Sequence, residues 1–186
     1  AFARDLARVV CESDPSDVEA LKGCAMGKAT VADALTEMIH VIGENMKIVR
    51  FQRVSVENGA LSSYVHLGGK LADIVMFSFS NAATAERDEF KTFAHDVAMQ
   101  VAASAPVAAK REDVPAQTIE REKAIYLAQA TDSGRPEAIW ETIANGKLEK
   151  FYKQIVLTEQ VFIKDSSLTI LELAKRTSDA CDDTIG

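Results

Sequence analysis

Apolar residues recur with a helical period over most of the chain. Val31, Leu35, Met38 and Ile42 follow one another at intervals of 4, 3 and 4 positions, which places them on one face of a helix that Thr30 is suited to cap. The sequence therefore predicts an amphipathic helix over residues 30–42. Shorter stripes of the same kind predict further helices over residues 2–10, 16–22 and 168–175.

The middle of the chain has a pattern typical of β-structure. Residues 48–56 and 61–67 are rich in apolar and β-branched residues, and Asn58-Gly59 between them is a dipeptide favoured in tight turns. Gly68-Gly69 marks a second bend, after which residues 71–80 have the composition of a third strand. These segments predict an antiparallel meander of three strands.

Helices are predicted to follow this sheet. A broad apolar face over residues 84–103 predicts a helix that packs on the sheet and ends before Pro106. Residues 114–155 predict a hairpin of two helices that turns at Ser133 to Pro136, with a narrow apolar seam between charged faces. Residues 156–163 predict a returning strand. We therefore predict an α+β fold: a small antiparallel sheet packed with helices, plus a protruding antiparallel helical hairpin, interpreted as a coiled coil.

The composition describes an ordered, acidic protein. The 186 residues are 47% apolar and 26% charged, which suffices to bury one substantial core or two small ones. The net charge of -7 argues against direct nucleic-acid binding, because phosphate contacts require clustered Lys and Arg. No apolar run approaches the roughly 20 residues that a membrane-spanning helix needs. We therefore predict an intracellular protein that binds neither nucleic acid nor membrane.

Side chains that could support catalysis or metal binding are scattered along the sequence. The cysteines and histidines show no CxxC pair and no regular spacing to one another. We therefore predict no metal, no cofactor and no catalytic residue. An enzyme is an alternative that would require a pocket to gather these residues. They are Cys11, Cys24, Cys181, His40, His66 and His95.

Several motifs occur in an order that resembles one protein family. Ser63-Tyr64-Val65-His66 is followed by Gly69-Lys70-Leu71, and the helix predicted after this block contains Ala98 to Ala103 as Ala-Met-Gln-Val-Ala-Ala. Further matches lie at Gly43 to Arg50, Gly134 to Pro136, Gly146 to Tyr152 and Leu157 to Phe162. This series of motifs, which covers about residues 30–173, is similar to the core of elongation factor Ts.

The resemblance implies a role in translation without covalent chemistry. Members of the elongation factor Ts family bind the GDP form of elongation factor Tu and promote GDP release, so the chain would be a guanine nucleotide exchange factor and not an enzyme. The docking subdomain of the family includes Tyr64 and His66, which lie two positions apart on one strand face, and we expect both to contact elongation factor Tu. Gln100 is a weaker candidate. The family also implies a location in the cytoplasm or in an organelle of bacterial descent.

The resemblance divides the chain into expected subdomains. Residues 1–58 would belong to an N-terminal core subdomain, residues 59–113 and 154–176 to a C-terminal core subdomain, residues 114–153 to the helical hairpin, and residues 177–186 to a C-terminal remnant.

The chain also departs from the family pattern. Ala72-Asp73 replaces a glycine and an apolar residue of the family, so we expect a more polar strand face there. The family's Thr-Asp-Phe-Val segment, which acts on the GTPase domain of elongation factor Tu, is not among the 186 residues. We therefore expect a core fragment with docking retained and exchange reduced. The alternative is a structural module that forms a homodimer without exchange activity.

Overall fold

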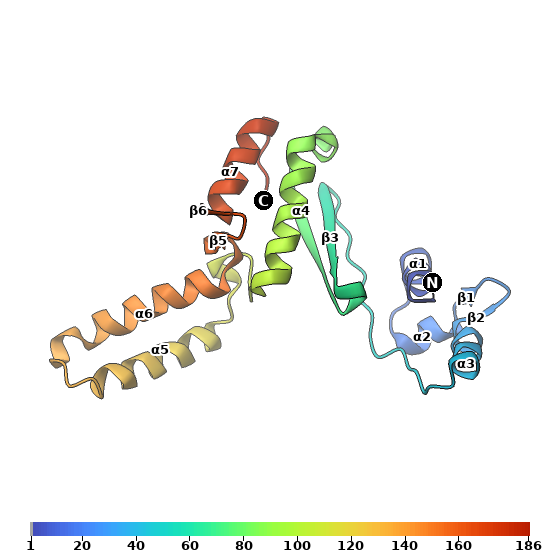
Figure 1. Ribbon diagram of the computed structural model, residues 1–186, viewed down its shortest axis with the longest axis horizontal. Helices are drawn as coiled ribbons and strands as arrows, with labels where there is room; N and C mark the ends of the chain where they lie inside the picture. The colour runs from blue at the N-terminus through green and yellow to red at the C-terminus, as the bar shows by residue number, and fades with distance from the viewer. Residues whose placement is uncertain (1) are drawn as a thin grey trace. The chain divides into compact units, whose positions relative to one another are not determined.

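The computed structural model describes residues 2–186, and the chain divides between Ser55 and Val56 into two compact units. Both units combine helices with short antiparallel strand pairs, which confirms the predicted α+β class. Figure 1 shows the order of the elements along the chain.

The first unit consists of short helices around a small core. The helices are α1 (Phe2–Ser13), α2 (Val18–Gly23) and α3 (Val31–Ile42), and a tight pair of strands, β1 (Ala25–Met26) and β2 (Ala29–Thr30), joins the last two helices. Val9, Val10, Leu21 and Val31 are buried together. Of the apolar stripes read from the sequence, Leu6, Val9, Val10 and Val31 therefore pack in this unit, whereas Ile42 at the end of α3 is 48% exposed.

The ends of α3 follow from the residues placed there. Thr30 and Asp33 form a reciprocal capping box, in which Asp33 N donates to Thr30 Oγ1 at 3.2 Å and Thr30 N donates to Asp33 Oδ2 at 3.1 Å. The hydrogen bonds from Thr30 lower the pKa of the Asp33 carboxyl. Gly43 ends the helix in the left-handed conformation, with φ of 78°. The prediction for this helix is confirmed.

Residues 44–56 form no strand, so the predicted first strand is wrong. Ile48 and Phe51 instead pack against the core of the first unit. Their spacing of three positions does not suit a strand, in which every second side chain shares a face. Asn58-Gly59 is therefore not a hairpin turn, and Gly59 has another role: a Cβ atom there would clash with the backbone carbonyl oxygen of Phe77.

The second unit is built on a two-stranded hairpin. Strands β3 (Gly59–His66) and β4 (Leu71–Ser78) pair antiparallel, with Tyr64 opposite Asp73 and His66 opposite Leu71. The chain turns through a 3-10 segment, Leu67–Gly69, in which Gly68 has φ of 67°. The predicted meander is thus reduced to its second and third strands.

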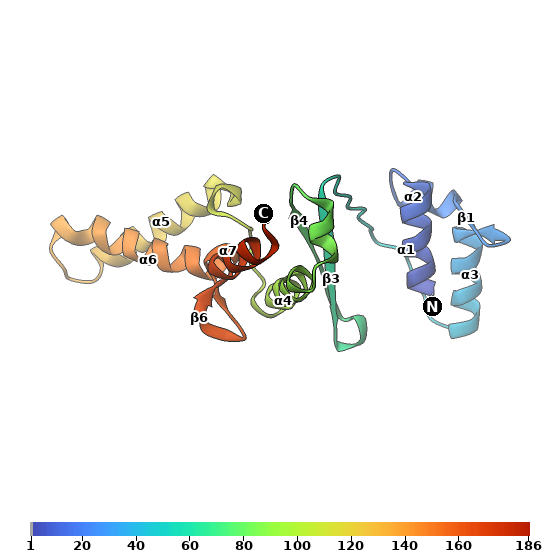
Figure 2. The ribbon, with the colours of Figure 1, turned by 90° about the horizontal axis from the view of Figure 1, so that it is seen from above.

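Helix α4 (Asp88–Ser104) follows a 3-10 turn at Ala82–Glu86 and covers one face of the hairpin (Figure 2). Four buried phenylalanines join the two layers. Phe77 lies edge-on to Phe90 and Phe93 with centroid distances of 5.5 Å, and Phe79 lies edge-on to Phe90 at 5.3 Å. Such aromatic pairs add about 0.5–1.5 kcal/mol each beyond the area that they bury. The predicted helix over the sheet is confirmed.

Helices α5 (Ala116–Thr131) and α6 (Trp140–Ile155) lie side by side and run in opposite directions (Figures 1 and 2). Between them, Tyr126 lies edge-on to Phe151 with a centroid distance of 6.5 Å, and Lys147 Nζ donates to Gln129 Oε1 at 2.6 Å. The two predicted helices are present. Their description as a coiled coil stays a prediction.

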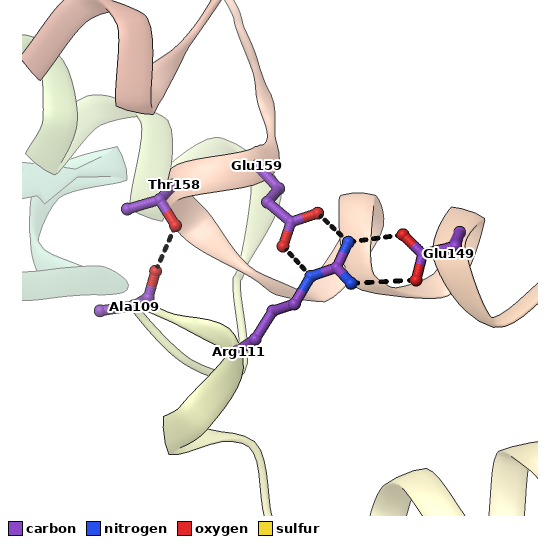
Figure 3. A network of polar contacts seen from close by, with 5 residues as sticks. All are labelled: Ala109, Arg111, Glu149, Thr158 and Glu159. Atoms are coloured by element: carbon purple, nitrogen blue, oxygen red, sulfur yellow. Dashed lines mark hydrogen bonds and ion pairs between the residues drawn. The ribbon is translucent and has the colours of Figure 1, made fainter. Parts of the chain in front are cut away.

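A cluster of charges fastens the base of this helical hairpin. The Arg111 guanidinium lies in a 3-10 turn, Arg111–Asp113, and binds the carboxylates of Glu149 and Glu159 (Figure 3). Its Nη1 and Nη2 reach the two oxygens of Glu149 at 2.9 and 2.7 Å, and its Cζ lies 4.3 Å from the ring centroid of Tyr152. The hydrogen bonds to these carboxylates raise the pKa of Arg111, and those from Arg111 lower the pKa of Glu149. The network joins the turn before α5 to α6 and to the segment that follows α6.

The chain returns to the core after α6. A 3-10 turn at Leu157–Glu159 leads to the strand pair β5 (Val161–Phe162) and β6 (Asp165–Thr169), and helix α7 (Ile170–Cys181) packs on α4. The predicted strand over residues 156–163 is therefore confined to two residues. The predicted final helix begins near its expected position but extends six residues further, from Lys175 to Cys181.

Gln100 of α4 is buried and forms hydrogen bonds to this returning segment. Its side chain is 1% exposed. Nε2 donates to Gln160 Oε1 at 3.1 Å and to the Val161 carbonyl oxygen at 3.2 Å, while Oε1 accepts from the Ile163 backbone N–H at 2.9 Å. Because Gln100 is buried and fully engaged, its candidacy as a partner contact is wrong.

The last residues are also part of the second unit. Gly186 and Ser78 exchange two backbone hydrogen bonds, at 2.8 and 2.9 Å, along the edge of β4. The Asp183 carboxylate accepts hydrogen bonds from the Ser80 and Thr84 hydroxyls at 2.7 and 2.6 Å, and these bonds hold the pKa of Asp183 far below its usual range. Asp183 thus links the end of the chain to the segment between β4 and α4.

We expect Gln100→Leu to lower the free energy of unfolding by about 1–3 kcal/mol, because the Ile163 N–H and the Gln160 side chain would lose partners in a buried place. Urea unfolding followed by circular dichroism measures the change. Gln117→Leu, at an exposed position of α5, is the matched control and should change stability by less than about 0.5 kcal/mol. Equal stability of the two variants would contradict the importance of these hydrogen bonds.

Candidate partner-binding surface

Tyr64 and His66 lie together on the same face of β3. The Tyr64 side chain is half-buried and His66 is exposed near the turn. Their rings stack with a centroid distance of 5.8 Å and an interplanar angle of 21°, and the Tyr64 hydroxyl lies 3.2 Å from His66 Nδ1. This contact holds the exposed imidazole in place. The structure therefore brings the two predicted site residues together.

His95 of α4 extends this group of rings. It is exposed, and its ring lies edge-on to Tyr64 with a centroid distance of 5.8 Å. Tyr64 is thus flanked by an imidazole from its own strand and by another from the covering helix. The sequence offered no local signal for His95, because the contact depends on how α4 crosses the hairpin.

Asp73 lies directly opposite Tyr64 in the strand pairing. Both of its carboxylate oxygens are buried, and neither has a hydrogen-bond partner within residues 2–186. Desolvation raises the pKa of this carboxyl above its ordinary value. The expected polar position on this strand is therefore present, and it is an unsatisfied acid beneath the aromatic group.

The opposite face of the β3–β4 hairpin is apolar and exposed. Alternation along each strand sends one set of side chains to α4 and the other set outward. Val65 is 61% exposed and Ile74 is 56% exposed, although both are large aliphatic residues. Contiguous apolar surface of this kind is typical of interaction sites. The outward set with the turn consists of Leu61, Val65, Leu67, Ile74 and Met76.

The three cysteines are divided between the two units of the chain. Cys11 is exposed and Cys24 half-buried in the first unit, whereas Cys181 is buried in the core of the second unit. Nowhere in the described part of the chain do three or more His, Cys, Asp or Glu residues lie close enough to hold a metal ion. Within residues 2–186, no helix combines the length and the apolar character needed to cross a bilayer.

We expect Asp73→Val to raise the free energy of unfolding at pH 7 by about 1–2 kcal/mol, because it removes a buried charge without partners. The pKa of this carboxyl is higher in the folded chain than the value of about 3.9 expected in the unfolded chain. The destabilisation therefore applies above the folded pKa and disappears as the carboxyl is protonated at lower pH.

Thermal unfolding at pH 7 and at pH 4 tests this expectation, and the gain should shrink at the lower pH. Ser63→Val, on the outward face of the same hairpin, changes β-propensity without removing a carboxylate and should have the same effect at both pH values. A gain from Asp73→Val that does not depend on pH would contradict the assigned cause.

Comparison with known proteins assigns the chain to a family. Residues 1–185 match the Elongation factor TS family. The chain is 41% identical over 172 residues to an Elongation factor Ts of Trichlorobacter lovleyi, a match that covers 91% of this chain and 55% of the relative. It is 37% identical over 188 residues to an Elongation factor Ts of Chloroherpeton thalassium, which covers 99% of this chain and 63% of the relative. The chain thus spans between 55% and 63% of the length of these relatives, and it belongs to the elongation factor Ts family.

Proposed function

We propose that this chain binds elongation factor Tu in its GDP form and promotes release of GDP, as a guanine nucleotide exchange factor of translation elongation. Tyr64 and His66 contact the partner in this proposal. The observation that carries it is the exposed His66 ring, which stacking on Tyr64 holds in place within the family's Ser-Tyr-x-His motif. The location proposed is the cytoplasm or an organelle of bacterial descent.

The contribution of these residues is binding, and no covalent step is involved. An exchange factor acts by binding the nucleotide-free state of its partner more tightly than the nucleotide-bound state, which shifts the partner's population toward release. A ring that is already fixed in the unbound protein loses little conformational freedom on docking. The stacked pair therefore suits an anchor that binds tightly with little rearrangement.

The apolar outward face of the hairpin supports a second candidate, a homodimer without exchange activity. Pairing of two such faces would cover Leu61, Val65 and Ile74, which are exposed in the single chain. Sedimentation of the chain alone and with elongation factor Tu separates the two candidates. A stable homodimer that excludes the partner would favour the structural module.

We expect the 186 residues by themselves to bind elongation factor Tu but to accelerate GDP release only weakly, because the Thr-Asp-Phe-Val segment that the family uses on the GTPase domain is outside this sequence. Release of a fluorescent GDP analogue from elongation factor Tu measures the rate. A full-length elongation factor Ts provides the reference. Acceleration equal to the reference would contradict the proposed division between docking and exchange.

We expect His66→Ala to weaken binding to elongation factor Tu by about 1 kcal/mol or more, because it removes an exposed and pre-oriented ring from the interface. Isothermal titration measures the affinity. His40→Ala, at an exposed position of α3, is the matched control and should leave the affinity unchanged. If both variants bind as tightly as the unaltered chain, His66 is not part of the docking surface.

A further inference from the structure

The helical hairpin carries an open groove of about 450 Å³ along its α6 side. Three cations line it: Arg135 from the turn, and Lys147 and Lys150 from α6. None of the residues that line the groove carries a carboxylate. Its local charge is therefore positive on a chain whose net charge is -7.

These cations are available to a ligand. Neither Arg135 nor Lys150 forms an ion pair within residues 2–186, and both are exposed. Glu149, which lies between Lys147 and Lys150 in sequence, is bound by Arg111 at the base of the hairpin. The charge of the groove is thus not cancelled by its neighbour in sequence.

The surrounding contacts hold the groove in shape. Lys147 Nζ donates to Gln129 Oε1 at 2.6 Å, which links α6 to α5 across the groove. The indole Nε1–H of Trp140 donates to the backbone carbonyl oxygen of Arg135 at 2.8 Å and so fixes the turn. Gln129, Ser133 and Thr142 add neutral polar groups to the lining. Such a mixture of cations and neutral donors is suited to carboxylates.

Gly146 forms part of the groove in the middle of α6. Glycine weakens a helix relative to alanine, and a Cβ atom built at Gly146 would meet no atom within 4 Å. The packing of the hairpin therefore does not require glycine here. The missing side chain leaves the α6 backbone open to close approach from outside.

We propose that this groove binds an acidic segment of a protein partner, with carboxylates paired to Arg135, Lys147 and Lys150 and with the segment's backbone close to Gly146. A protein segment fits better than a nucleic acid, because three cations could neutralise only a few phosphates on an otherwise acidic chain. This site lies on α5 and α6, apart from Tyr64 and His66 on β3, and does not depend on the proposed exchange activity.

The test uses an isotope-labelled sample of the whole 186-residue chain and a peptide of about eight Asp and Glu residues. We expect amide resonances of Gln129, Thr142, Gly146 and Lys150 to shift on addition of the peptide. A matched peptide of Asn and Gln should leave them in place. Shifts spread over many lysines and arginines, or no shifts at all, would overturn the proposal. So would tighter binding of a single-stranded RNA of similar length at these residues.

Variants separate this groove from general charge attraction. The double change Arg135→Glu with Lys150→Glu should weaken peptide binding by about tenfold or more, because it places repulsive charges at both ends of the site. Lys123→Glu, at an exposed position of α5 outside the groove, is the charge control and should weaken binding by less than about twofold. Equal loss in the double variant and the control would overturn the proposal.

Gly146→Ala tests the close approach without changing charge. It should weaken peptide binding by about threefold or more while the melting temperature stays the same or rises, because alanine favours the helix and fits without a clash. Circular dichroism of each variant verifies that the hairpin is folded. Unchanged binding by Gly146→Ala would remove the backbone contact from the proposal.

Discussion

The packing of α4 on the β3–β4 hairpin is the contact on which the second unit depends. A two-stranded hairpin is marginal by itself in water and needs another layer to bury one of its faces. The four phenylalanines at this contact supply that layer: Phe77 from β4, Phe79 from just after it, and Phe90 and Phe93 from the first half of α4. Because they gather at one end, the opposite end of the hairpin, with its turn and His66, stays at the surface. The same packing that stabilises the sheet therefore exposes the candidate docking residues.

Hydrogen bonds and ion pairs attach the rest of the second unit to this layer. Gln100 joins α4 to β5 through the Val161 carbonyl oxygen, and Asp183 joins the end of the chain to the segment before α4. Arg111 attaches the helical hairpin to the returning segment. It is more exposed, and each of its ion pairs alone would contribute little to stability. What matters at Arg111 is the geometry, because one planar guanidinium binds two carboxylates from different segments and lies over the Tyr152 ring. The Arg111 network therefore fixes orientation more than it adds stability.

Local signals in the sequence predicted much of this fold. The capping residues Thr30 and Gly43, the Gly68-Gly69 bend and the spacing of Tyr64 and His66 act within a few residues, so their outcome could be foreseen. The conformation of the segment around Ile48 and Phe51 could not be foreseen, because a composition typical of β-structure does not reveal whether a partner strand exists. The contacts of Gln100, Asp183 and His95 join residues far apart in the chain. The resemblance to a family pointed to the candidate docking residues and to a polar position at Asp73, but not to the lack of hydrogen-bond partners for its carboxylate.

The second unit thus presents two surfaces with different physical character. The β-hairpin offers aliphatic and aromatic side chains, whose burial mainly slows dissociation of a partner. The helical hairpin offers exposed cations in an open groove, and charges of this kind mainly speed association and select among partners. Arg111 links the base of the helical hairpin to the segment that returns to the core. The two surfaces therefore belong to one unit, in which this ion-pair network supplements the covalent chain. Charge attraction acts over about a Debye length, whereas apolar burial requires direct contact. A partner that contacts both surfaces would therefore first be attracted by the groove and then be retained by the apolar face.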